Sequence, residues 1–415
     1  MSITKPFRAF RPRPDLAERV AALPYDVMSS EEARQRVKDN PYSFLHADKA
    51  EIDLSPDIDL YDARVYQKAR ENLDKMIADG VLQQDQQDNF YIYRQIMNGR
   101  SQTGIVACCS IDEYLDNKIK KHEFTRADKE QDRINHVDVC DANTGPIFLT
   151  YRHREDIDHL IDEWCRKYEP VYNFKADDGI IHVVWVIDDR SVIAKLQQDF
   201  QQVEELYIAD GHHRCASGVK VGQMRRRQHP DYSGAEEFNY FLAVIFPDKD
   251  LQIMDYNRVV KDLNGLSREA FLAAVEEKFI VTEASSDRPY KPLTRHTFGM
   301  YIEGRWFELK ARPGTFDDTD PVARLDVSIL QNNLLRPVLG IEDPRTNKRI
   351  DFIGGIRGLE ALERRVNEGM AVAFSMYPVT IQDLMNIADA GQVMPPKSTW
   401  FEPKLRSGLF IHKLS

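Results

Sequence analysis

One short segment of the chain combines the residue types that bind phosphate groups. Residues 203–218 read VEELYIADGHHRCASG. The apolar run from Val203 to Ala209 predicts a strand, Asp210-Gly211 ends it, and the pattern from Cys215 onward predicts a helix. A strand that ends in glycine before a helix leaves several backbone N–H groups pointing at one place, which is typical of an anion site.

The polar side chains at this junction match such a site. Arg214 and the imidazoles of His212 and His213 supply donors, and Asp210 could hold a metal ion or orient a histidine. The plain alternative is a turn that caps a helix and leaves the histidines in solvent. Three such residues in a row after Asp-Gly favour the functional interpretation.

A second polar cluster lies between residues 122 and 133, in a segment without a convincing apolar face. It could bind phosphate through Thr125, Arg126 and Arg133 and supply a carboxylate from Glu123. The alternative is a solvated, charged helix start with Thr125 as its cap, and this cluster alone does not decide between the two.

The C-terminal tail carries a third cluster. Lys397, Ser398 and Thr399 give one cation and two hydroxyls, and Lys404 follows. These groups suit phosphate or magnesium, but the glycines of a P-loop are missing, and an ordinary loop is the alternative. Near the N-terminus, Pro24-Tyr25-Asp26 predicts a turn before a helix capped by Ser29 or Ser30.

Other sites are disfavoured by the spacing. His212 and His213 are adjacent, so on a regular element they diverge and do not ligate one metal as an i, i+4 pair would. Cys215 is expected to pack inside the helix rather than to act as a thiolate. The chain contains no GxGxxG, HExxH or GxSxG motif.

Composition limits the classes of protein and partner. The chain has 415 residues, a formal net charge of −11 and five scattered cysteines. The acidic balance argues against a nucleic-acid partner, and the absence of a long apolar run argues against a membrane partner. The cysteines and the lack of an apolar leader predict a cytoplasmic protein with reduced thiols.

Predicted strands and helices alternate, with hairpins in places. Helices are expected at about 112–121 and 322–335, and a core strand at 238–246. The pattern predicts a mixed α/β or α+β fold.

Five segments together resemble a known family. They are ALPYDVMSSEE, NPYSFLH, HEFTRADKEQDR with GPIFLTY, YIADGHHRCASG and MPPKSTWFEPKLRSGL. The set is similar to the family called domain of unknown function 1015, some members of which are described as ATP-dependent kinases of free serine. The DGHHR segment also resembles the phosphate-binding turn of the ParB/sulfiredoxin superfamily.

The resemblance implies a fold and its division. It implies a ParB/sulfiredoxin-like nucleotide-binding core with an additional smaller α+β unit. We expect a main domain at 1–261, the smaller unit at 262–320, and residues 321–415 completing the core.

The resemblance also implies an activity, which is transfer of the ATP γ-phosphoryl group to the hydroxyl of L-serine with Mg²⁺. Glu123, as general base, Asp210 and His212 would act in catalysis, and Asp210 would hold the metal. Tyr25, Asp26 and Asp132 would bind substrate. The phosphate ligands would be Gly211, His213, Arg214, Thr125, Arg126, Arg133, Lys397, Ser398, Thr399 and Lys404.

Two other functions fit the same anion site. One is a nucleotide-binding regulatory protein without turnover, and the other is a phosphatase or nucleotidase. The product separates them, because a kinase makes phosphoserine, a hydrolase releases free phosphate and a switch makes neither. The oligomeric state is open, with a homodimer as one option.

Overall fold

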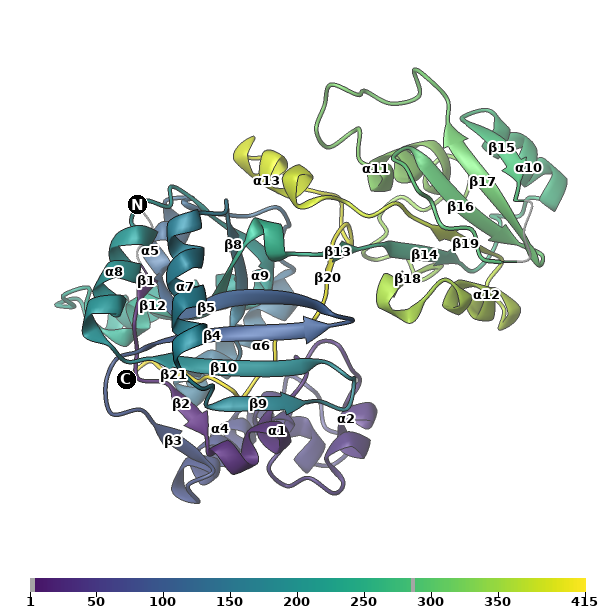
Figure 1. The fold of residues 1–415 in the computed structure, drawn as a ribbon. Helices are drawn as coiled ribbons and strands as arrows, with labels where there is room; N and C mark the ends of the chain where they lie inside the picture. The colour runs from purple at the N-terminus through teal and green to yellow at the C-terminus, as the bar shows by residue number, and fades with distance from the viewer. Residues whose placement is uncertain (1–3, 285–287) are drawn as a thin grey trace. The chain divides into compact units, whose positions relative to one another are not determined.

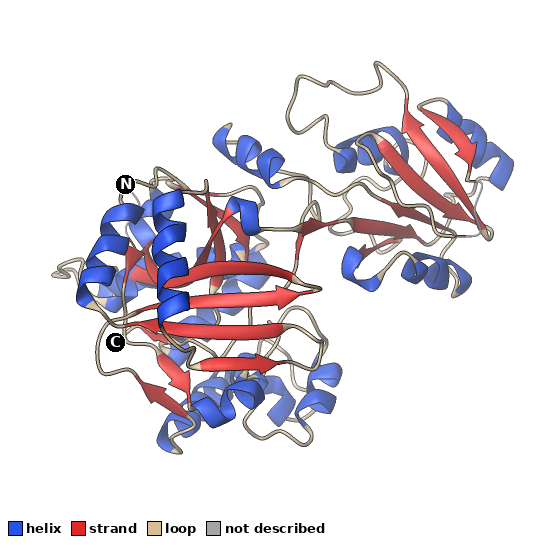
Figure 2. Ribbon diagram, viewed as in Figure 1, coloured by secondary structure: helices blue, strands red, loops and turns tan. Residues whose placement is uncertain are grey.

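The computed structural model describes residues 4–284 and 288–415, which divide into two compact units. The first unit comprises Met1–Leu251 and Pro403–Ser415, and the second comprises Gln252–Glu402. Helices and strands occur in both units (Figures 1 and 2), so the predicted mixed α/β fold is confirmed. The second unit therefore extends well beyond the predicted 262–320, and only the last 13 residues return to the first.

A mixed sheet forms the centre of the first unit. Its strand order is β6-β11-β8-β12-β5-β4-β10-β9, and β1 pairs with one end of β5. The strands of this unit are β1 (Thr4–Lys5), β2 (Phe10–Pro12), β3 (Leu82–Gln84), β4 (Phe90–Met97), β5 (Arg100–Ser110), β6 (Ile119–Lys120), β7 (Ala142–Asn143), β8 (Ile147–Tyr151), β9 (Tyr172–Lys175), β10 (Ile181–Ile187), β11 (Leu206–Asp210), β12 (Tyr240–Pro247) and β21 (His412–Lys413).

Helices of the first unit bury the apolar side chains of this sheet. They are α1 (Ala17–Val20), α2 (Ser30–Val37), α3 (Leu45–Asp48), α4 (Ala63–Ala78), α5 (Ile111–Leu115), α6 (Ala127–Cys140), α7 (Glu155–Lys167), α8 (Arg190–Phe200) and α9 (His212–Gln228). Apolar residues of α7 and α8, such as Ile161 and Leu196, share one core with Ile105 and Trp185 of the sheet. A second core joins α4 to the N-terminal helices and to Ile411 of the tail.

The C-terminal tail is part of the first unit's architecture. Ile411 exchanges backbone hydrogen bonds with Phe10, and β21 pairs with β7. Two buried amides hold the start of the tail, because Gln95 Nε2 donates to the carbonyl of Lys404 at 2.9 Å and Gln102 Nε2 to that of Pro403 at 3.4 Å. These contacts hold the backbone of Pro403 and Lys404.

The second unit is built on an antiparallel sheet of order β15-β17-β16-β19-β14-β18. Its elements are β13 (Ile253–Met254), β14 (Tyr256–Val260), β15 (Phe279–Glu283), β16 (Thr297–Ile302), β17 (Arg305–Ala311), β18 (Ile350–Gly354), β19 (Val372–Ser375), β20 (Trp400–Phe401), α10 (Arg268–Glu276), α11 (Asp326–Leu330), α12 (Glu360–Asn367) and α13 (Ile381–Asp389). No helix among the described residues is both long and apolar enough to cross a membrane.

Three predicted elements differ in detail. The helix expected at 112–121 ends at Leu115, because Asn117 adopts a positive φ of 57° before β6 begins. The helix expected at 322–335 is α11 followed by a π-helical turn, Gln331–Leu335. The helix expected from Cys215 begins at His212, so the two histidines and Arg214 form its first turn.

Candidate functional site

The end of β11 and the start of α9 have the geometry of an anion site. Gly211 lies between them with a φ of 90°, a left-handed conformation that glycine adopts without a steric penalty. It is the N-cap residue of α9, and no side chain caps the helix. The first N–H groups of a helix have no partner within it, so those of His212, His213 and Arg214 are available to an anion.

Arg214 folds back over this turn. Its Nη1 donates to the carbonyl oxygen of Pro146 at 2.7 Å. A Cβ on Gly211 would lie 3.1 Å from Nη2, and one on Gly145 would lie 3.4 Å from Nη1, so both glycines make room for the guanidinium. Pro146 precedes β8, which is antiparallel to β11, so the start of β8 meets the end of β11 at one edge of the sheet.

Asp210 is held in its ionised form by neighbouring cations. Its Oδ1 accepts the N–H of Gly211 at 2.9 Å, and its Oδ2 accepts Nζ of Lys404 at 3.0 Å. Burial alone would raise the pKa of Asp210, but the charges of Lys404 and Arg214 and these hydrogen bonds bring it well below its usual value. The carboxylate therefore stays charged at neutral pH and orients Lys404.

A second arginine approaches from α6. Arg133 Nε donates to Asp132 Oδ2 at 3.0 Å, and its guanidinium lies 3.9 Å from the ring centre of Tyr25. The other oxygen of Asp132 accepts the hydroxyl of Tyr66 at 3.0 Å. Asp132 thus positions Arg133, and its predicted contact with substrate stays a prediction.

Both arginines line one cavity. Its walls include Tyr25, Asp48, Arg133, His136, Gly145 and Arg214. Burial and the charge of Asp26 raise the pKa of Tyr25, although Arg133 and Arg214 oppose this, so its hydroxyl stays protonated. Two guanidinium groups facing one cavity favour a ligand that carries negative charge.

The loop before α6 is tied to the start of α9. His213 Nε2 accepts the backbone N–H of Arg126 at 3.0 Å. The hydroxyl of Thr125 donates to Glu130 at 2.6 Å, and the guanidinium of Arg126 binds Asp128 at 2.8 Å. Thr125 and Arg126 therefore have protein partners, and their predicted phosphate contacts stay predictions.

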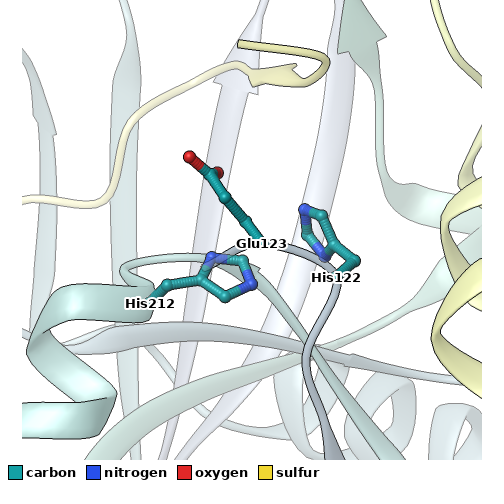
Figure 3. Close-up of side chains that lie close together, drawn as sticks. All are labelled: His122, Glu123 and His212. Atoms are coloured by element: carbon teal, nitrogen blue, oxygen red, sulfur yellow. The ribbon is translucent and has the colours of Figure 1, made fainter. Parts of the chain in front are cut away.

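Two histidines and a glutamate meet beside this turn (Figure 3). The rings of His122 and His212 pack edge to face with centres 4.5 Å apart, and Glu123 lies next to them. Burial lowers the pKa of His122 to about 4. Burial, together with the proximity of His122, lowers that of His212 well below its usual value. Both imidazoles are therefore neutral at neutral pH.

The remaining predicted residues belong to the second unit. The carbonyl of Lys397 accepts Nη2 of Arg258 at 3.0 Å, and its ammonium lies 5.7 Å from the ring centre of Tyr256. The hydroxyl of Ser398 donates to the carbonyl of Pro395 at 2.5 Å. Lys397, Ser398 and Thr399 all precede the boundary at Glu402, and their predicted phosphate contacts stay predictions.

Sequence reasoning missed several residues that shape the cavity. The hydroxyl of Thr144 donates to Asp48 Oδ1 at 2.7 Å, and His136 Nε2 contacts the carbonyl of Ala47 at 3.0 Å. Asp48 ends a four-residue helix, and His136 lies inside a longer one. Neither residue stands in a turn or a polar cluster, and these are the two sequence features that predict a binding site. The segment GPIFLTY has no polar cluster that would mark it as part of a site, although Gly145 and Pro146 contact the guanidinium of Arg214.

Comparison with known proteins identifies the family. Residues 4–328, more than three quarters of the chain, match the profile of a family described as protein of unknown function (DUF1015). The chain belongs to the DUF1015 family. A search of curated proteins found no match for this DUF1015 chain.

Several solved structures resemble the DUF1015 chain weakly. A free serine kinase in complex with AMP is 15% identical, with 72% of this chain and 86% of that one covered and a TM-score of 0.35. A conserved hypothetical protein from Pyrococcus furiosus is 14% identical over 73% and 93% of the two chains, with a TM-score of 0.37. C-terminally truncated SbnI from Staphylococcus aureus is 10% identical over 72% and 82%, with a TM-score of 0.38.

Proposed function

We propose that the first unit binds the phosphates of ATP at the end of β11 and transfers the γ-phosphoryl group to the hydroxyl of free L-serine. One observation carries the proposal: Arg133 and Arg214 line one cavity, and Arg214 also covers the glycine turn at which the N–H groups of α9 are open. We take L-serine as the acceptor because the sequence motifs resemble a family with ATP-dependent free serine kinases among its members.

This arrangement suits phosphoryl transfer in particular. The reaction needs little covalent chemistry from the protein and depends on positioning and on cations around the phosphate oxygens. Arg214 is fixed by Pro146, Arg133 by Asp132, and Lys404 by Asp210. Donors that are already oriented lose little entropy when the charge on the transferred group is redistributed.

The acceptor hydroxyl requires a base, and two carboxylates compete for this role. Asp26 is exposed, and its charge acts on both Tyr25 and His213. Glu123 instead clusters with His122 and His212. We therefore assign the base to Asp26 rather than to the predicted Glu123, with Tyr25 forming the adjoining wall of the substrate site.

A magnesium ion would enter with the nucleotide. Mg²⁺ prefers oxygen ligands and keeps several waters, so one or two carboxylates and the phosphates suffice to hold it. Asp210 fits, because it is ionised and lies at the glycine turn, although Lys404 occupies its Oδ2. The ion would neutralise charge on the phosphates when bound.

The direct test is phosphorus NMR of the purified protein with ATP, Mg²⁺ and L-serine beside a serine-free control. We expect a phosphomonoester signal that depends on serine. Free phosphate without phosphoserine would favour a hydrolase, and unchanged ATP in both samples would favour a regulatory nucleotide-binding protein. Either result would contradict the kinase proposal.

A pair of variants tests the assignment of the base. Asp26→Asn should reduce phosphoserine formation about 100-fold, because general-base catalysis contributes on the order of 10²–10⁴-fold, while ATP binding stays near that of the wild type. Asp88→Asn is the matched control, since Asp88 is an exposed carboxylate paired only loosely with Arg8 at 3.9 Å. Full activity in Asp26→Asn would show that Asp26 is not the general base.

A further inference from the structure

The pairing of two short strands brings two histidines together. β6 and β11 are parallel neighbours, with Ile119 opposite Leu206 and Lys120 opposite Tyr207. His122 follows the end of β6 by two residues, and His212 follows the end of β11 by two. Because parallel strands end at the same edge of a sheet, both imidazoles emerge at one place.

Both imidazoles are buried, and within the described part of the chain three of their four ring nitrogens lack an ordinary hydrogen bond, although a backbone contact with Ile208 acts on the pKa of His122. His122 is 1% exposed and His212 is 7% exposed. Among the described residues, no hydrogen bond of ordinary geometry reaches either ring nitrogen of His122 or Nε2 of His212. Buried polar atoms are nearly always hydrogen-bonded, so three such atoms in one cluster call for a ligand.

The cluster also contains a carboxylate. One ligand atom from each of His122, Glu123 and His212 can be chosen so that all lie within 4.8 Å of one another (Figure 3). Ligand atoms around a tetrahedral zinc ion are roughly 3.3–3.6 Å apart, given bond lengths of about 2.0–2.2 Å. Small side-chain rotations would close that gap.

We propose that His122, Glu123 and His212 form a binding site for a divalent transition-metal ion of the zinc type. Two imidazoles and one carboxylate suit zinc, cobalt or iron, whereas Mg²⁺ prefers oxygen ligands. Three protein ligands leave at least one coordination position for water or for an oxygen of a ligand. This site is separate from the magnesium ion proposed for the nucleotide, and it does not depend on the kinase proposal.

The surrounding charges favour a cation. The carboxylate of Asp210 acts on both histidines and is partly balanced by Lys404. The positive charge of Lys121 disfavours a cation near His212. Its ammonium, however, packs on the ring of Tyr114, 4.1 Å from the ring centre. Carboxylates near ligating histidines commonly strengthen a metal site.

The test uses untagged full-length protein that has been freed of metal and then titrated with Co²⁺ alone, with no nucleotide present. We expect one equivalent to give the visible absorption of a low-coordinate cobalt site, and one equivalent of Zn²⁺ to abolish it. Absence of saturable binding in the wild type would overturn the proposal.

Variants assign the ligands. His122→Gln and His212→Gln should each weaken Zn²⁺ binding at least 100-fold, and Glu123→Gln about tenfold or more. His213→Gln is the matched control, because His213 is adjacent in sequence but turns its Nε2 to the N–H of Arg126. Equal loss in His213→Gln and His212→Gln, or no loss in His122→Gln, would contradict the site.

One measurement avoids the folding of variants altogether. X-ray absorption of the zinc-loaded wild type should show two imidazole nitrogens and at least one oxygen around the metal. A sulfur ligand, a single imidazole or an all-oxygen shell would overturn the assignment. Because no ATP or serine is involved, these results are independent of the phosphorus NMR test.

Discussion

Charged groups in the two units are arranged in different ways. In the first unit, Arg133, Arg214 and Lys404 come from α6, α9 and the C-terminal tail and gather near the end of β11. In the second unit, Arg295 pairs with Asp383 at 2.7 Å, and the buried Arg258 donates to backbone carbonyls. Arg133 and Arg214 also line one cavity, which indicates a ligand, whereas an ion pair and carbonyl contacts without a shared cavity are sufficient to stabilise a fold.

The largest effect on turnover is expected from Arg214→Ala. Removing a preorganised donor to a developing charge costs roughly 100- to 1,000-fold in kcat, so serine kinase activity should fall by at least 100-fold. The far-UV circular dichroism spectrum should not change. Arg227→Ala is the matched control, because Arg227 lies exposed near the other end of the same helix. An equal loss of activity in both variants would mean that the change in net charge, and not the position of Arg214, causes the effect.

Gly211→Ala should have the next largest effect. An alanine there is strained at a φ of 90°, and its Cβ would lie 3.1 Å from Arg214 Nη2. We expect activity to fall about tenfold or more and unfolding free energy to fall by about 1–2 kcal/mol.

Gly234→Ala separates these two consequences. Gly234 has a similar φ of 93°, but a Cβ there would meet nothing within 4 Å. Urea unfolding should therefore show a similar loss of unfolding free energy in the two variants. Steady-state kinetics should show normal activity only in Gly234→Ala. Loss of activity in Gly234→Ala would mean that backbone strain alone explains the result.

Lys404→Met should change the pH dependence of turnover. Lys404 helps to hold the pKa of Asp210 below its usual value, so its removal should raise that pKa. If turnover requires ionised Asp210, the acidic limb of the kcat/KM profile should move to higher pH, with a loss of a fewfold at pH 7. An acidic limb at the same pH in both proteins would show that ionisation of Asp210 does not control turnover.

The smallest effect on turnover is expected in the second unit, at Asp326. Burial raises the pKa of this carboxyl from 3.8 to about 7, and its Oδ1 accepts the N–H of His296 at 2.9 Å. Between these pH values the folded state holds a proton that the unfolded state lacks. This group therefore makes the wild type less stable as pH rises from about 4 to 7.

Asp326→Asn should remove this dependence. Asparagine keeps the Oδ1 acceptor without a charge, so the variant should exceed the wild type in stability by up to about 4 kcal/mol at pH 8 and match it at pH 4. Urea unfolding at the two pH values is the measurement, and serine kinase activity should be unchanged. Identical pH dependence in the two proteins would contradict the raised pKa.

The sequence predicted the strand, turn and helix of the β11–α9 junction better than the contacts around it. Gly211 and the three polar residues after it form one local motif, and local motifs are visible in a sequence. β6 has only two residues, so its pairing with β11, and with it the meeting of His122 and His212, left no periodic signal. The adjacency of His212 and His213 gave no indication that His212 packs against His122, which comes from another segment.

The tail illustrates the same limit. Lys397 and Lys404 lie seven residues apart in one polar segment, and both were expected to bind phosphate. The boundary between the units falls between Glu402 and Pro403, so the two lysines belong to different units. Gln95 on β4 binds the backbone of Lys404, and Gln102 on β5 binds that of Pro403; such long-range contacts have no signature in the local sequence.

The central claim is that the glycine turn of the first unit binds the phosphates of the nucleotide. Calorimetric titration with ATP and Mg²⁺ tests it most directly on three proteins, namely the wild type, Arg214→Ala and Arg227→Ala. We expect the wild type and Arg227→Ala to bind one ATP with similar affinity, and Arg214→Ala to bind at least 30-fold more weakly, in line with about 2 kcal/mol for a charge-assisted hydrogen bond. Full affinity in Arg214→Ala, or an equal loss in Arg227→Ala, would contradict the account.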